Sequence, residues 1–98
     1  MADVARKLKP DTEYLLDGFE VEWDVGVRMA RNWTSLTDDE QAVFVETWAI
    51  PRGYIHELRL RSERGELTAS QRRRFAILQR RVDEQRATIE AVLEDIVI

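Results

Sequence analysis

The sequence contains no cysteine, which excludes disulfide bonds and thiolate metal ligands. Histidine occurs once, at His56, so no pair of imidazoles can hold a metal ion. No apolar run approaches the roughly 20 residues that span a bilayer, and the first ten residues lack the apolar core of a secretory signal. A chain without cysteine fits a reducing compartment. We therefore expect a cytoplasmic protein with no metal, no other cofactor and no membrane partner.

Glycine and proline are also scarce, at four and two residues, in a chain of 98 residues that is 44% hydrophobic and 35% charged. The apolar content is too high for a disordered chain, and the residue types favour helices over sheets. This length predicts one domain. We expect a loose arm over residues 1–10 and a single helical domain over 11–98. All lysines lie in the first ten residues, and this preference for arginine hints at a bacterial gene.

Residues 18–27, GFEVEWDVGV, fit two different patterns. Apolar and polar residues alternate as in a half-buried strand, but the surrounding apolar residues also recur at helical spacing. The apolar positions of the helical pattern are Leu16, Phe19, Trp23, Val27, Ala30 and Trp33. A strand would need a partner for its edge, and no other segment has a β pattern. We favour a helix, with Val21 and Val25 away from its main apolar face.

The middle of the chain begins with Thr37 and Glu40, which have the spacing of a helical capping box. An apolar stripe then runs from Phe44 to Leu58. Pro51 interrupts it, because proline lacks the amide donor that a helix interior requires. The alternatives are one helix kinked at Pro51 or two short helices, and the unbroken phase of the stripe favours the kinked helix.

A heptad pattern marks the last segment, from about residue 69 to 95, which is predicted to be one long helix. Its positions are Phe75, Leu78, Val82, Gln85, Ile89, Val92 and Ile96. This seam is longer than two shorter neighbouring helices can cover. The overall prediction is therefore an all-α bundle of three main helices that self-associates as a homodimer. The residues predicted for self-association are Val82, Gln85, Ile89, Val92 and Ile96.

Charge is segregated along the chain, which carries −4 overall. Residues 11–46 hold ten acids and two arginines, whereas residues 52–86 hold ten arginines and five acids. The favoured interpretation is that the acidic first helix packs beside the basic later ones, within one chain or in a dimer. The alternative is an anionic partner on an arginine face made by Arg73, Arg74, Arg80 and Arg81. Of these, Arg73 and Arg74 have no acid four residues away on the same helix, so we expect them to be the freest.

The two function classes that fit these patterns are both binding functions. We favour a non-enzymatic interaction protein that binds another protein, such as a small regulator, an antitoxin-like partner or an adaptor. The rival is a nucleic-acid-binding protein that uses the four arginines, although the sequence pI of about 5.0 argues against it. A helix-turn-helix around Pro51 is a weaker version of that rival. A small enzyme using arginines and carboxylates is disfavoured, and we assign no catalytic residue.

Overall fold

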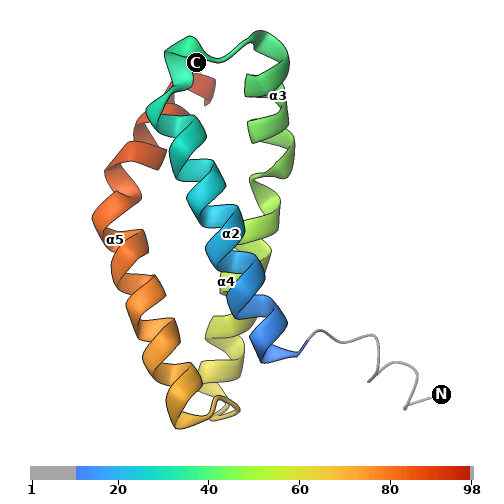
Figure 1. Cartoon of the computed structure of the whole chain (residues 1–98), viewed down its shortest axis with the longest axis vertical. Helices are drawn as coiled ribbons and strands as arrows, with labels where there is room; N and C mark the ends of the chain where they lie inside the picture. The colour runs from blue at the N-terminus through green and yellow to red at the C-terminus, as the bar shows by residue number, and fades with distance from the viewer. Residues whose placement is uncertain (1–10, 98) are drawn as a thin grey trace, which may run out of the picture.

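The computed structural model describes residues 11–97, and the side-chain surroundings of residues up to Glu94. All regular structure in this range is helical (Figure 1). The elements are α2 (Thr12–Arg31), the short 3-10 helix η1 (Trp33–Ser35), α3 (Asp38–Thr47), α4 (Ala49–Glu63) and α5 (Ala69–Val97). The arm predicted for residues 1–10 lies outside the described residues.

The middle helix is formed by α3 and α4 together and is bent by 22° at residue 48. The prediction of an all-α fold with three main helices and a bent middle one is therefore confirmed. The bend lies at Trp48, three residues before Pro51. Gly65, with a φ of +71°, follows the end of α4, and the Glu66 amide donates to the Arg61 carbonyl. Glycine suits this position because a side chain is strained at positive φ.

The stretch 18–27 lies within α2 and is helical, as the sequence favoured. Its apolar stripe is buried, with Leu16 fully covered and Trp23 only 6% exposed. Val21 and Val25 are exposed, at 60% and 42%. The alternation that resembles a strand thus comes from valines on a solvent-facing side of a helix.

Side-chain caps fix where α2, α3 and α5 begin. The Tyr14 amide donates to the Asp11 carboxylate at the start of α2, over 2.7 Å. At α3 the predicted capping box is present, since the Glu40 amide donates to Thr37 Oγ1 and the Thr37 amide donates to Glu40 Oε1. The hydrogen bond from the Thr37 amide holds the pKa of the Glu40 carboxyl below its ordinary value. Thr68 and Gln71 make the same reciprocal bonds before α5.

In the bundle, α2 occupies the centre, with the middle helix on one side and α5 on the other (Figure 1). α2 and α5 run in the same direction, and α4 runs in the opposite direction. Both α4 and α5 pack extensively on α2, while their direct contacts with each other are few. The core that results is built on buried side chains from all three, including Phe19, Phe44, Leu58, Phe75 and Leu78.

None of the helices described is long and apolar enough to cross a membrane.

Candidate functional site

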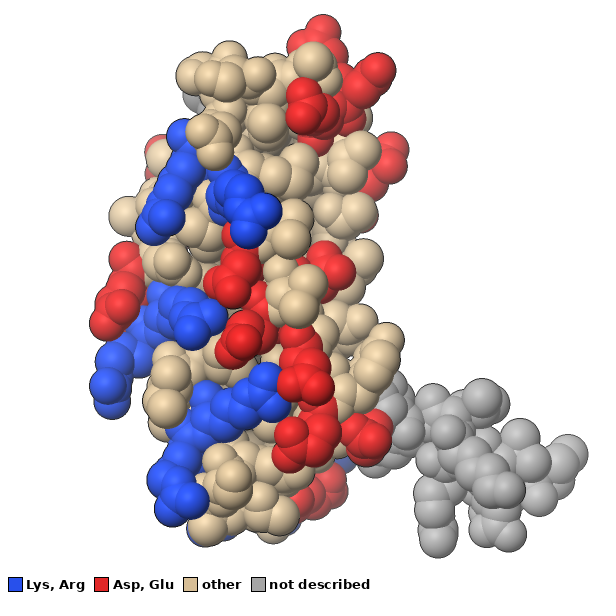
Figure 2. Space-filling view, viewed as in Figure 1, with Lys and Arg blue, Asp and Glu red and all other residues tan. Residues whose placement is uncertain are grey.

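The acidic side of α2 is matched to arginines of α5. Arg74 pairs with Asp17 at 2.6 Å and with Glu13 at 3.4 Å. One heptad further along, Arg81 pairs with Asp24 at 3.3 Å and with Glu20 at 3.9 Å. Figure 2 shows acidic side chains running along α2 with arginine side chains beside them. The prediction that the acidic first helix packs beside the basic last helix is confirmed.

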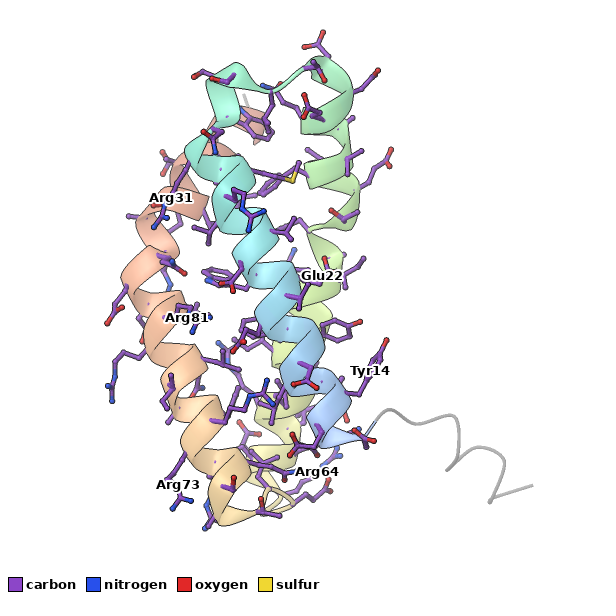
Figure 3. All side chains as sticks on the ribbon, in the orientation of Figure 1. Tyr14, Glu22, Arg31, Arg64, Arg73 and Arg81 are labelled. Carbon is purple, nitrogen blue, oxygen red and sulfur yellow. The ribbon has the colours of Figure 1, made fainter. Side chains whose placement is uncertain are left out.

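The four arginines predicted as a partner-binding face therefore divide into two pairs. Arg74 and Arg81 are held by α2, which corrects the expectation that Arg74 would be free, because its partners lie on another helix. Arg73 and Arg80 are exposed and make no ion pair with the residues that the structure describes. In Figure 3, Arg81 extends toward α2, whereas Arg73 extends away from the bundle. Nucleic-acid binding by the four arginines stays a prediction.

The predicted self-association seam lies largely within the core of one chain. Ile89 and Val92 are 3% and 5% exposed, and Val82 is half-buried against the same core. Gln85 accepts a hydrogen bond from Trp23 Nε1 over 2.6 Å. The side chain of Ile96 lies outside the described surroundings. Self-association stays a prediction, and among these residues Val82 and Gln85 keep some accessible surface to take part in it.

A groove lies between α4 and α5, because these helices are spread apart by their common packing on α2. Its main hollow has a volume of about 250 Å³, and a second hollow of about 200 Å³ continues it toward Gln79. We call the two together the α4–α5 groove. Apolar side chains from all three helices form its floor. They are Phe19, Trp23, Ile55, Val82, Ile89 and Leu93.

Aromatic contacts hold this floor in place. The rings of Trp23 and Trp48 lie 5.8 Å apart, and Phe19 stacks on Trp23 at 6.0 Å. The indole of Trp23 is further fixed by its bond to Gln85. Trp23 is buried and Gln85 is partly buried, so this bond satisfies the indole N–H where water has little access.

The rim of the groove is charged, and its two sides differ. On the α4 side stand Arg52 and Arg59, both exposed and neither in an ion pair with a described residue. On the α5 side stand Asp83, Arg86 and Glu90. Arg86 pairs with Asp83 at 2.7 Å, but no ion pair joins the two sides of the groove among the described residues. The α4 side is thus purely cationic, and the α5 side carries two carboxylates and one arginine.

This arrangement offers binding chemistry. The groove is partly open to solvent and has an apolar floor, so it can bind an apolar side chain or the apolar face of a helix. The charged side chains of the rim can form ion pairs with a bound partner. His56 is exposed on α4. Within residues 11–97, with side chains considered as far as they are described, no three acidic or histidine side chains converge as metal ligands would.

Sequence reasoning did not identify the groove, or Arg52, Arg59, Asp83 and Glu90 as residues of its rim. The groove depends on how far α4 and α5 stand apart, which no local pattern encodes. One signal was available, because each of these like-charged pairs is spaced seven residues apart and so lies on one face of its helix. Comparison of the chain with protein-family models, curated proteins and solved structures finds no match.

Proposed function

We propose that this chain is a non-enzymatic interaction protein whose α4–α5 groove receives the apolar face of a helix from another protein molecule. The observation that carries the proposal is the separation of α4 from α5. Both helices pack on α2 and leave Ile55, Val82 and Leu93 only partly buried above an aromatic floor. A partner helix would cover these side chains as the fourth member of the bundle.

The dimensions of the groove support a helical occupant. Along α5 it runs from Gln79 to Leu93, which is about 20 Å at the rise of an α-helix. A helix of similar length places apolar residues on one face every three or four positions, and helix-in-groove recognition uses this spacing.

The other function classes have less support. For nucleic acid, Arg74 and Arg81 would have to exchange their carboxylate partners on α2 for phosphates, which leaves Arg73 and Arg80 as the accessible pair. For catalysis, the groove floor is apolar, and among the described residues no three acidic or histidine side chains converge as metal ligands would.

The test compares two matched substitutions on α5. Leu93→Glu places a carboxylate in the groove, and Ile77→Glu places one on the outer face of the same helix, where Ile77 is 57% exposed. We expect Leu93→Glu to abolish the associations of the wild-type chain, both with itself in light scattering and with proteins co-purified from the native host. Ile77→Glu should retain them. Unchanged associations in a folded Leu93→Glu variant would refute the groove as the binding site.

We further attribute the 22° bend of the middle helix to Pro51. Its ring nitrogen cannot donate to the Thr47 carbonyl four residues earlier, and the ring crowds that carbonyl. The residue at the bend, Trp48, lines the groove together with Pro51. Replacing Pro51 with Ala should straighten the helix at Trp48, which a crystal structure of the variant would measure. An unchanged bend would assign it instead to packing on α2.

A further inference from the structure

We propose that the helix received by the α4–α5 groove is α5 of a second copy of this chain, in a two-fold symmetric dimer. The two copies would place their grooves face to face, so that α5 of each copy enters the groove of the other and lies beside its α4. This inference rests on the proposed function, because it names the occupant of the same groove.

The rim charges of the groove are self-complementary. Arg52 and Arg59 stand two turns apart on α4, and Asp83 and Glu90 stand two turns apart on α5. Two turns correspond to about 10 Å on either helix. A second copy therefore offers carboxylates at the same separation as the unpaired guanidinium groups. In a two-fold dimer each such pair occurs twice, because symmetry repeats every contact.

The register of the two helices also agrees. Arg59 and Asp83 line the same end of the groove, and Arg52 and Glu90 line the other part. α4 and α5 run in opposite directions. A two-fold axis parallel to the helices would bring the partner's α5 beside α4 at equal height. Arg59 would then meet Asp83 of the partner subunit, and Arg52 would meet Glu90 of the partner subunit.

The chain already uses this form of matching inside itself. Arg74 and Arg81, also seven residues apart, meet carboxylates of α2 that repeat at the same interval. By contrast, Arg52, Arg59 and Glu90 have no ion-pair partner among the described residues. Asp83 is bound to Arg86 in an exposed pair, but a carboxylate has room for a second donor. Arg86, the third rim cation, keeps that partner in the dimer.

Apolar contacts would supply most of the stabilisation. Ile55, Val82 and Leu93 are partly buried in one chain, and the second copy would cover them. The proposed dimer contact includes Val82 of the predicted self-association seam, whereas Ile89 and Val92 remain in the core of each chain. An unrelated helix would fill the floor equally well, but the paired spacing of opposite charges on the two sides of one groove favours a second copy.

Charge reversal gives the test. Wild type, Arg52→Glu/Arg59→Glu and Asp83→Lys/Glu90→Lys are compared by sedimentation equilibrium at low salt. We expect a wild-type dimer, and each double variant should dimerise at least about tenfold more weakly because its rim contacts become repulsive. An equimolar mixture of the two variants should form a heterodimer, since each then supplies the charges that the other lacks.

A control with the same net charge as the arginine reversal is Arg73→Glu/Arg80→Glu, which reverses the exposed pair on the outer face of α5 and should dimerise like wild type. Circular dichroism confirms that each variant is folded. A monomeric wild type at high micromolar concentration would overturn this inference and leave the groove to the helix of a different protein. The inference would also be overturned if both charge-reversal variants dimerised as strongly as wild type. It would likewise be overturned if the control variant dimerised as weakly as the charge-reversal variants. Only the Leu93→Glu result bears on the groove itself.

Discussion

The two sides of α2 are packed by different means. Toward the middle helix, α2 presents glycines, and aromatic rings lie directly on its backbone. A side chain at Gly18 would meet the ring of Tyr54 at 2.9 Å, and one at Gly26 would meet Trp48 at 3.1 Å. Toward α5, α2 presents carboxylates that meet Arg74 and Arg81. The first side fixes how closely two helices approach, and the second fixes their register.

The difference shows where the stability of the bundle resides. Close apolar packing is sensitive to single methylene groups, whereas exposed ion pairs contribute little free energy but discriminate among alignments. Substitutions on the glycine side should therefore unfold the protein more easily than substitutions on the arginine side. The four predictions that follow test this contrast in order of decreasing effect.

The largest effect is expected from Gly26→Val. Its branched side chain would press on Trp48 and on Phe44, which is 1% exposed and cannot move into solvent. Overpacking of this kind should lower the free energy of unfolding by about 3 kcal/mol. The matched change Gly53→Val, where no atom lies within 4 Å of the new Cβ, should alter it by less than about 0.5 kcal/mol. Urea denaturation measures both, and equal effects would contradict the close-approach role of Gly26.

A smaller loss is expected from Gln85→Leu on the α5 side. The Trp23 indole N–H, buried with its ring, would lose its acceptor, which should cost about 2 kcal/mol. In a Trp23→Phe background the same change should cost much less, because no donor is then left without a partner. The double-mutant cycle by chemical denaturation measures this coupling. Additive effects would mean that the hydrogen bond contributes nothing to stability.

Arg81→Gln should have a still smaller effect. The side chains of Arg81 and Asp24 are 35% and 46% exposed, so their pairing is screened by water. We expect a loss below about 1 kcal/mol that disappears at high salt. Arg80→Gln, on the outer face of α5, is the control and should leave the free energy of unfolding unchanged. A loss of several kcal/mol would show that the arginine side carries more stability than its exposure allows.

The smallest effect is expected from Tyr14→Phe. The hydrogen bond with Tyr14 raises the pKa of the Tyr54 hydroxyl above its ordinary value. A raised pKa favours the neutral phenol in the fold, so its contribution to stability is complete below the unfolded pKa and is lost as pH rises through the folded one. Tyr14→Phe should lower the Tyr54 pKa, and it should lower stability at neutral pH only slightly because Tyr14 is exposed. Absorbance of the phenolate measures this without interference, because Tyr54 is then the sole tyrosine.

Much of the fold could be predicted from local patterns. The capping residues Thr37 and Thr68 act within one turn of helix, so sequence spacing alone identifies them. The apolar stripe of α2 likewise follows from its period. From the sequence alone, Gly18 and Gly26 only weaken a helix, because their benefit depends on rings from a different helix.

The candidate site was harder to predict, since it depends on distances between helices. Arg74 was expected to be free because its own helix has no suitable acid, yet Glu13 and Asp17 reach it from α2. The burial of Ile89 and Val92 within one chain could not be separated from burial between chains by a heptad pattern, since both use the same face. The groove itself follows from α2 standing between α4 and α5.

The placement of Trp23 and Trp48 on the groove floor gives the chain a natural optical reporter. Indole emission depends on the polarity of its surroundings, and these two rings lie where any occupant would displace water. Trp33, which packs against Phe44, does not line the groove, so its emission should change least. Occupancy of the groove can therefore be followed in the unlabelled protein, by dilution or titration, before any partner has been tagged.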